Sequence, residues 1–382
     1  MKILTNIRFY RVAGIAQSLQ AFLDYLERTP TGISVIGVNV MKPNEIQETA
    51  PVRHPDVLTV RSLTVDYPEI GSLMQQTGSL ADIAEQLRPI IEFYALVIRE
   101  ERPDVIVING TYFLPWCLLR ASRLFRIPTV VHYHGLISKE TEHWDDRARA
   151  LFRQMEQDFD RAEIHYVFPS ELARCTVEQQ VFGHLIQNAS VLPNGIRDHF
   201  FQPPAMVPKK KNPVIGFVSR WTRIKNTRFI ECFSKYAHRK KNGRYRIAVV
   251  TDAQINPTIT ERLKKFITFK RPSSQAKLAR FYRACGIVLS PSRFETYGNV
   301  AQEAVACGTP SLVSEQMGVA ETFRKIGLDD LIIDFSCPKR VLENIEMLLN
   351  YPIPQETIET LRKNFSNEKI SAEFVQILKS IA

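Results

Sequence analysis

The sequence lacks several features that would place it in other classes of protein. Its six cysteines are scattered and never form a Cys-x-x-Cys pair, which argues against a disulfide framework or a zinc site and for a reducing compartment. No apolar run approaches the roughly 18–20 residues that a membrane-spanning helix needs. The N-terminal residues have no long apolar core, so we expect no signal peptide. Walker phosphate loops, Gly-x-Ser-x-Gly elbows and short repeats do not occur.

Acidic residues are fewer than basic ones. The chain has 40 Asp and Glu against 50 Lys and Arg, a formal net charge of +10. Such a surplus suits phosphorylated ligands, nucleic acid or an anionic membrane face. Charge alone makes nucleic-acid binding a rival hypothesis, but no nucleic-acid motif accompanies the basic runs 209–211 and 238–246. We interpret these runs as solvated loops, or as a weak attraction to anionic lipid.

The length of 382 residues predicts two domains. Apolar strands alternate with helical patterns, which indicates parallel sheets whose ligands bind beyond the carboxyl ends of the strands. The segment 200–213 is rich in proline and lysine, and it is predicted to be a linker between two such α/β regions. We therefore predict one α/β domain over 1–205, a second over 206–355 and a final helical segment over 356–382.

The most informative stretch is a predicted strand–loop–helix unit at 287–306, with the strand at 287–289 and the helix at 300–306. An apolar strand ends at a Ser-Pro-Ser sequence, because proline cannot continue a strand ladder. Glu295 lies in the loop, Gly298 permits a tight turn, and Glu303 lies on the following helix. The free backbone N–H groups at such a helix start form a ready anion site. Two carboxylates at this spacing are also compatible with an ordinary turn bearing solvated side chains.

A second segment, 216–225, carries two cations just beyond a predicted strand. Arg220 and Lys225 lie five residues apart. A planar guanidinium and a compact ammonium both bind phosphate oxygens, and fixed cations stabilise a departing diphosphate. The alternative is a solvated basic face with no ligand.

Together these two segments resemble the retaining glycosyltransferases of the GT-B fold, family 4, also called glycosyltransferase group 1. The resemblance implies two Rossmann-like α/β domains facing a central cleft, with the C-terminal helix 356–382 packing back on the first domain. It implies a hexosyltransferase that needs no metal and no cofactor and uses a nucleotide-diphosphate sugar, a UDP- or GDP-sugar, as donor. The acceptor would be a glycan, a lipid-linked sugar or a small molecule, as in polysaccharide biosynthesis.

The resemblance also assigns roles to individual residues. Arg220 and Lys225 would hold the diphosphate, Glu295 would lie beside the transferred sugar, and Glu303 would accept hydrogen bonds from the ribose hydroxyls. His134 would face the donor sugar. The remaining donor-binding positions are the loop glycine Gly14, the strand glycine Gly216 and the backbone N–H groups of Tyr297, Gly298 and Asn299.

Some positions depart from the family pattern, and others are alternatives to the residues that the family pattern assigns. Asn226 stands where the family has a glycine after the lysine, and Ala13 where it has a second glycine before Gly14. Because of these changes, an alternative hypothesis stays open: the chain is a catalytically inactive GT-B subunit that binds glycan or stabilises a partner glycosyltransferase. His132 competes with His134 for the histidine role. An Asp-x-Asp sequence at 158–160 is expected to be a solvated helix end rather than a metal site. The expected location is the cytoplasm, with the inner face of the membrane as a candidate contact.

Overall fold

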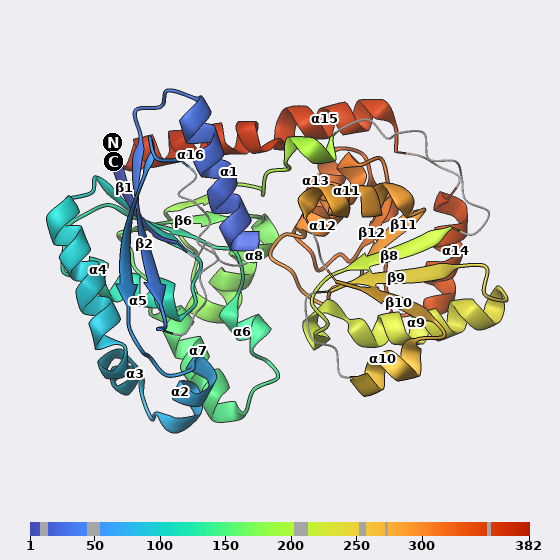
Figure 1. Ribbon diagram of the computed structural model, residues 1–382, viewed down its shortest axis with the longest axis horizontal. Helices are drawn as coiled ribbons and strands as arrows, with labels where there is room; N and C mark the ends of the chain where they lie inside the picture. Colours follow the sequence, from blue (N-terminus) through green and yellow to red (C-terminus); the bar gives the residue numbers. More distant parts are fainter. Residues whose placement is uncertain (8–13, 44–53, 202–212, 252–256, 272–273, 350–352) are drawn as a thin grey trace. The chain divides into compact units, whose positions relative to one another are not determined.

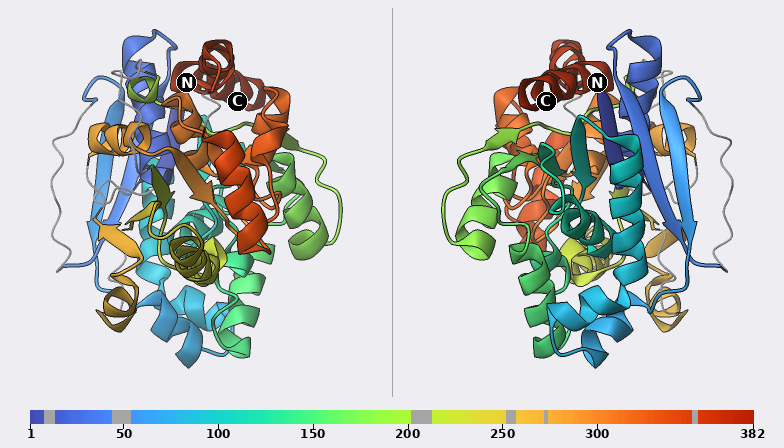
Figure 2. Two further views of the ribbon diagram at one scale, coloured as in Figure 1. Left: turned by 90° about the vertical axis from the view of Figure 1, so that its right-hand side faces the viewer. Right: turned by 90° about the vertical axis from the view of Figure 1, so that its left-hand side faces the viewer.

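The computed structural model describes residues 1–7, 14–43, 54–201, 213–251, 257–271, 274–349 and 353–382. The chain forms two compact units. Unit 1 comprises Met1–Pro193 together with Asn367–Ala382, and unit 2 comprises Asn194–Ser366. Each unit is built around a parallel β-sheet with helices on both of its faces (Figures 1 and 2).

Unit 1 contains a seven-stranded parallel sheet in the order β3-β2-β1-β4-β5-β6-β7. Its strands are β1 (Lys2–Ile7), β2 (Ser34–Met41), β3 (Leu58–Thr64), β4 (Val105–Asn109), β5 (Thr129–His132), β6 (Ile164–Phe168) and β7 (Ala189–Val191). Its helices are α1 (Gly14–Arg28), α2 (Ile70–Gln76), α3 (Leu80–Gln86), α4 (Arg88–Glu101), α5 (Phe113–Ser122), α6 (Ile137–Glu140), α7 (Asp146–Gln157), α8 (Glu171–Val177), the π-turn η1 (Glu178–Phe182) and α16 (Asn367–Ile381).

The C-terminal helix α16 is part of the core of unit 1. Phe374 and Leu378 of α16 are buried with Phe22 and Leu23 of α1 against one face of the sheet. The rings of Phe22 and Phe374 meet edge to face, with centroids 5.1 Å apart. The two helices are in contact and cross one another in the view of Figure 1. Apolar burial of this kind stabilises by roughly 25 cal/mol per Å² and fixes α16 on unit 1.

Unit 2 contains a five-stranded parallel sheet in the order β10-β9-β8-β11-β12. Its strands are β8 (Val214–Val218), β9 (Arg246–Val250), β10 (Ile267–Lys270), β11 (Ile287–Ser290) and β12 (Ser311–Val313). Its helices and helical turns are η2 (Asp198–Phe200), η3 (Arg223–Lys225), α9 (Thr227–Lys240), α10 (Pro257–Leu263), α11 (Gln275–Ala284), α12 (Asn299–Ala306), α13 (Val319–Lys325), η4 (Asp329–Leu331), α14 (Pro338–Leu348) and α15 (Gln355–Phe365).

The units divide at positions that differ from the predicted 205 and 355. Phe200 and Phe201 lie in the hydrophobic core of unit 2, so the chain enters that unit after Pro193. The predicted final helix is two helices, because the chain becomes extended at Ser366. The N–H of Ile196 donates to the carbonyl of Phe365 at 2.8 Å, which ties the end of α15 to unit 2.

Each sheet has a point at which the order of its strands reverses. In unit 1 it lies between β1 and β4, and in unit 2 between β8 and β11. Connections that leave neighbouring strands in opposite directions open a crevice at the carboxyl ends of those strands, and ligands of such folds bind there. The segments after β8 and β11 are those that carry Lys225 and Glu295.

None of the helices formed by the described residues combines the length and the apolar character needed to cross a bilayer.

Candidate active site

The loop after β8 places Lys225 on a short helical turn. Arg223–Lys225 form the turn η3, which ends at Asn226 in the left-handed conformation, with φ 55° and ψ 41°. Asparagine adopts this conformation more readily than most residues other than glycine, because its short side chain hydrogen-bonds locally. Asn226 therefore provides the backbone geometry that a glycine would give at this position. With asparagine in place of the family's glycine, the loop can therefore still turn into α9.

Lys225 and Glu295 form an ion pair that joins the two predicted segments. The Nζ of Lys225 lies 2.8 Å from the Oε1 of Glu295, and the two side chains are 13% and 26% exposed. The Oγ of Ser292 donates to the Oε2 of Glu295 at 3.0 Å. The N–H of Arg293 donates to the carbonyl of Ile224 at 2.8 Å, so the backbones of the loops are joined as well. The carboxylate is thus fixed from two sides beside the ammonium.

The turn into α12 is built around Gly298. Its φ is 124°, a conformation that residues with a side chain rarely adopt. A Cβ at this position would lie 2.7 Å from the Cε of Met317 and 3.0 Å from Cγ1 of Val319. The N–H of Val319 donates to the carbonyl of Tyr297 at 2.8 Å, and that of Gly318 to the carbonyl of Glu295 at 3.0 Å. The turn is therefore packed closely against the segment that begins α13.

The start of α12 offers donors to an anion. Among the residues that the structure describes, none accepts a hydrogen bond from the backbone N–H of Gly298, Asn299 or Val300. These groups lie at the positive end of the helix dipole. The Nδ2 of Asn194 donates to the Oδ1 of Asn299 at 2.8 Å, and the carbonyl of Asn194 accepts from the Nε2 of Gln302 at 3.0 Å. Asn194 therefore holds this helix start in place from outside it.

Glu303 lies on α12 with a largely enclosed carboxyl group. Its Oε2 accepts a hydrogen bond from the hydroxyl of Tyr282 on α11 at 3.0 Å. Burial raises the pKa of Glu303 to about 7, and the Tyr282 hydrogen bond and the positive charge of Arg197 act in the opposite direction. A carboxylate with acceptor capacity left over is suited to bind hydroxyl groups. Tyr282 carried no signal in the sequence that pointed to this contact.

Because its native pKa is raised, Glu303 is expected to make stability fall as pH rises from about 4.5 to about 7. The native state keeps its proton over this range, whereas the unfolded chain has lost it. The substitution Glu303→Gln should remove this decline, worth at most about 3 kcal/mol. The difference in free energy of unfolding between the two proteins, measured in urea at several pH values, checks it. Glu356→Gln, at an exposed position of α15, is the control and should leave the pH profile unchanged.

Two of the predicted donor-binding positions also have packing roles in the fold. Gly216 lies inside β8, paired with Ala248 of β9 and Val288 of β11, and a Cβ there would lie 2.8 Å from the Sγ of Cys285. Its place in the sheet interior gives the glycine a packing role, and its contact with the donor stays a prediction. The side chain of Tyr297 is buried, and its hydroxyl hydrogen-bonds Gln302 and Thr322 at 3.0 and 2.9 Å. Only the backbone of Tyr297 faces the turn.

Arg220 lies just beyond β8, in the same connection as Lys225. Its side chain is exposed, and its carbonyl accepts a hydrogen bond from the N–H of Thr222 at 3.0 Å. The ion pair at the centre of the site is formed by Lys225 and does not include Arg220. The structure therefore brings Lys225, Glu295 and the start of α12 together, and leaves Arg220 as a neighbouring cation on the same loop.

In unit 1, His134 follows β5, and its ring lies beside that of His132 at an interplanar angle of 43°. The ring centroids of His132 and His134 are 4.2 Å apart, and the ring of Phe374 from α16 lies 5.1 Å from that of His132. Burial lowers the pKa of His134 to about 4, and that of His132 is lowered by burial and by His134. Both rings are therefore neutral at pH 7. Gly14 begins α1, and the preceding residues, with Ala13, lie outside the described part of the chain.

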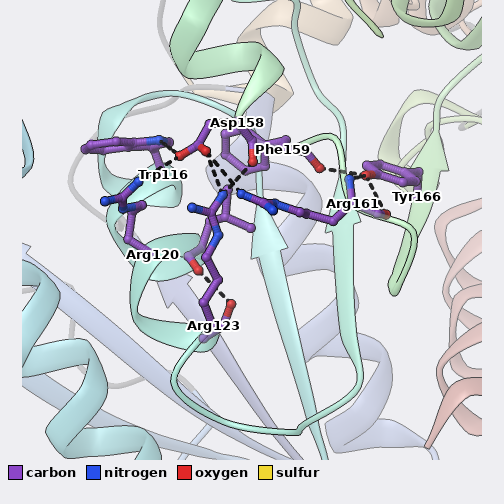
Figure 3. Close-up of polar contacts among 9 residues, drawn as sticks. Trp116, Arg120, Arg123, Asp158, Phe159, Arg161 and Tyr166 are labelled. Carbon is purple, nitrogen blue, oxygen red and sulfur yellow. Dashed lines mark hydrogen bonds and ion pairs between the residues drawn. The ribbon is translucent and has the colours of Figure 1, made fainter. Parts of the chain in front are cut away.

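The Asp-x-Asp sequence at 158–160 is not the solvated helix end that we expected. The carboxylate of Asp158, 14% exposed, lies 2.9 Å from Arg123 and 3.5 Å from both Arg120 and Arg161. The Nε1 of Trp116 donates to it at 2.8 Å (Figure 3). Asp158 thus joins the end of α7 to the end of α5, away from the carboxyl ends of the strands. The arrangement is structural.

Replacing Asp158 by asparagine should destabilise unit 1 by about 1–3 kcal/mol at pH 7, because the three guanidinium groups lose their counter-charge. Burial acts to raise the pKa of Asp158, but the hydrogen bond and charge of Arg123 outweigh it, so the pKa is lowered. The stabilisation is therefore present above pH 4 and lost as pH falls below it. Urea unfolding at pH 7 and pH 3 measures both effects. Asp146→Asn is the control, because that carboxylate is 93% exposed; an equal loss in both variants would contradict the prediction.

Two family models together match most of the chain. The family model "Glycosyl transferase 4-like domain" matches residues 14–194, and "Glycosyl transferases group 1" matches residues 212–351. A D-inositol 3-phosphate glycosyltransferase from Frankia alni is 34% identical over 101 residues, which cover 26% of this chain and 25% of that protein. The chain therefore aligns with only about a quarter of the length of this curated relative.

Two solved structures share the fold over the whole chain. Sucrose-phosphate synthase from Thermosynechococcus elongatus has a TM-score of 0.75 at 17% identity, covering 100% of this chain and 98% of that one. The E. coli trehalose-6-phosphate structure bound with UDP-2-fluoro glucose has a TM-score of 0.71 at 15% identity, covering 100% of both chains. With two parallel α/β units and family models matched in both halves, this chain has the GT-B fold and belongs to the group 1, family 4 glycosyltransferases.

Proposed function

We propose that this protein is a retaining, metal-independent glycosyltransferase whose donor is a nucleotide-diphosphate sugar bound by unit 2. The observation that carries the proposal is the 2.8 Å contact between Lys225 and Glu295, because it joins a fixed cation to the loop that leads into the start of α12. A cation and free helix N–H groups on connected loops are what a diphosphate requires. The acceptor would be a glycan, a lipid-linked sugar or a small molecule bearing a hydroxyl group.

The proposed reaction needs charge stabilisation more than proton transfer by the protein. The bond from the sugar C1 to the diphosphate oxygen breaks, and its electron pair leaves with the diphosphate. Lys225 and the N–H groups of Gly298, Asn299 and Val300 would stabilise that growing charge. The acceptor oxygen forms the new bond on the same face of the sugar, and its proton passes to the departing phosphate. No general base from the protein is required in this scheme.

Two carboxylates would position the donor. Glu295, fixed by Ser292 and Lys225, would lie beside the hydroxyls of the transferred sugar. Glu303 would accept hydrogen bonds from the ribose hydroxyls while keeping its contact with Tyr282. Arg220 is proposed as a second cation for the diphosphate. His134, neutral at pH 7, is proposed as a contact to the transferred sugar.

Nucleotide binding gives the most direct test of this proposal. A thermal-shift screen against UDP, GDP, ADP and their sugars should give one nucleotide family that raises the melting temperature, because binding to the native state stabilises it. The identified donor is then assayed with EDTA present, and the anomeric configuration of the product is determined by NMR. Retained activity in EDTA and a retained configuration support the proposal. Nucleotide binding without transfer to any acceptor, or hydrolysis of the donor, would favour the inactive binding subunit instead.

A further inference from the structure

Positive charge is concentrated in one part of unit 2. Residues 214–286 contain eighteen lysines and arginines against three aspartates and glutamates, a net charge of +15. The whole chain carries +10, so the remaining residues together carry −5. The protein therefore has a strong charge asymmetry along its sequence, and the described residues of 214–286 form β8 to β10, the turn η3 and α9 to α11.

Five cations of this region form what we call the basic rim. They are Arg239, Lys240, Arg244, Arg246 and Lys265, and all five are exposed. The rim is contributed by the end of α9, the loop into β9, the first residue of β9 and the loop from α10 into β10. Long cationic side chains from two successive helix–strand connections therefore reach solvent in the same part of unit 2.

The sheet register places these connections side by side. The strands β9 and β10 are parallel neighbours, with Ile247 opposite Ile267, so both begin at the same edge of the sheet. Arg246, the first residue of β9, and Lys265, two residues before β10, therefore share that edge. It is the edge formed by the amino ends of the strands. Lys225 and Glu295 follow the carboxyl ends, so the rim and the candidate active site lie at opposite edges of this sheet.

Within the described part of the chain, no close ion pair neutralises the rim; the charge of Arg244 acts on Glu346, whose pKa is lowered mainly by Lys241 and also by Arg244. Lys241 pairs with Glu346 at 2.7 Å, and Lys264 pairs with Glu261, so neighbouring lysines do have carboxylate partners. The five rim cations form no ion pair with any carboxylate that the structure describes. The dipole of α9 favours cations in its last turn and accounts for Arg239 and Lys240. The dipole does not account for Arg244, Arg246 and Lys265, which lie beyond α9.

We propose that the basic rim is a docking surface for a lipid bilayer that contains anionic lipid. Single-stranded nucleic acid would need exposed aromatic rings for base stacking, but Tyr245 is buried and Phe266 is half-buried. Lysine and arginine without such rings match an anionic headgroup surface, where each added cation strengthens binding roughly fivefold. The rest of the chain is net negative, so the anionic membrane surface would repel it. This repulsion would orient the protein with the rim toward the lipid.

Sedimentation with vesicles tests this surface without any donor or turnover, so its result does not depend on the proposed function. The full chain should bind vesicles of 30% phosphatidylserine in phosphatidylcholine, bind more weakly as salt rises, and not bind pure phosphatidylcholine. The double variant Lys240→Glu/Lys265→Glu should lower binding at least tenfold. The control Lys325→Glu/Lys363→Glu makes the same change of net charge at exposed positions of unit 2 outside the rim, and should lower binding less than threefold.

Three outcomes would overturn the proposal. One is failure of the unaltered chain to bind anionic vesicles at low salt. Another is an equal loss in the rim variant and the control variant, which would mean that only net charge matters. The third is tighter binding to RNA than to vesicles, with the same loss in the rim variant, which would identify a nucleic-acid surface. Circular dichroism of both variants establishes that neither result comes from unfolding.

Discussion

Substitution of Lys225 by alanine is expected to lower kcat for sugar transfer by about 10²–10³-fold, the cost of removing one fixed group that stabilises transition-state charge. The ammonium lies 2.8 Å from Glu295 in a pair that is partly shielded from solvent, so water does not replace it well. Steady-state assays with the donor found by thermal shift measure the effect. The melting temperature should change by little, because a pair of this exposure contributes about 1 kcal/mol or less to stability.

Arg228→Ala is the matched control for Lys225→Ala. It removes one positive charge from an exposed position in the first turn of α9, three residues away in sequence. Its kcat should stay within about threefold of the unaltered protein, because exposed charges at this distance are screened by salt. Normal turnover by Lys225→Ala would contradict the proposed diphosphate site. Equal losses in the two variants would show that general positive charge, and not this ammonium, is required.

Substitution of Gly298 by alanine is expected to have the largest effect on stability, about 2–6 kcal/mol. Two costs combine here. Alanine at φ 124° is strained by about 1–3 kcal/mol. The new Cβ would also lie 2.7 Å from Met317, which forces an adjustment in a packed interior that costs about 1–3 kcal/mol. Because the same turn presents the N–H groups at the start of α12, nucleotide binding should be lost together with stability. Urea unfolding and the thermal shift with nucleotide measure the two effects.

Gly327→Ala separates the two costs. Gly327 also has a positive φ of 70°, but nothing lies within 4 Å of the position where its Cβ would be. This variant carries the backbone strain without the clash, and it should lose about 1–2 kcal/mol while its nucleotide response is unchanged. If Gly298→Ala lost no more stability than Gly327→Ala and still bound nucleotide, the turn would not be the rigid anion site that we propose.

Local sequence signals were sufficient for the strand–loop–helix unit that carries Glu295 and Glu303. The predicted strand at 287–289 and helix at 300–306 differ from β11 and α12 by one residue each. The reason is that the signals are short-range: an apolar run, a proline that stops a strand, and a glycine at a position where φ is positive. The GT-B fold and the family were predicted from the same stretch and from segment 216–225, and the family models match both halves of the chain.

Contacts between distant parts of the chain decided what the sequence left open. Pairing of Lys225 with Glu295 depends on the adjacency of β8 and β11, which are separated by two other strands in the sequence. The packing role of Gly216 was not evident from the sequence, because the side chain of Cys285 that lies against it comes from a distant part of the chain. Asp158 was predicted to be solvated, but the helix ends that surround it place arginines on its carboxylate.

By itself, the sequence of this protein determined its alternation of strands and helices, its two-unit α/β architecture and the loops that carry the candidate site, since hydrophobic periodicity and turn chemistry act over a few residues. Only the tertiary structure decided which charged groups meet, where the chain passes from one unit to the other, and that α15 and α16 are separate helices in different cores. The order of strands within a sheet sets these features, because it brings together residues that lie far apart in the chain.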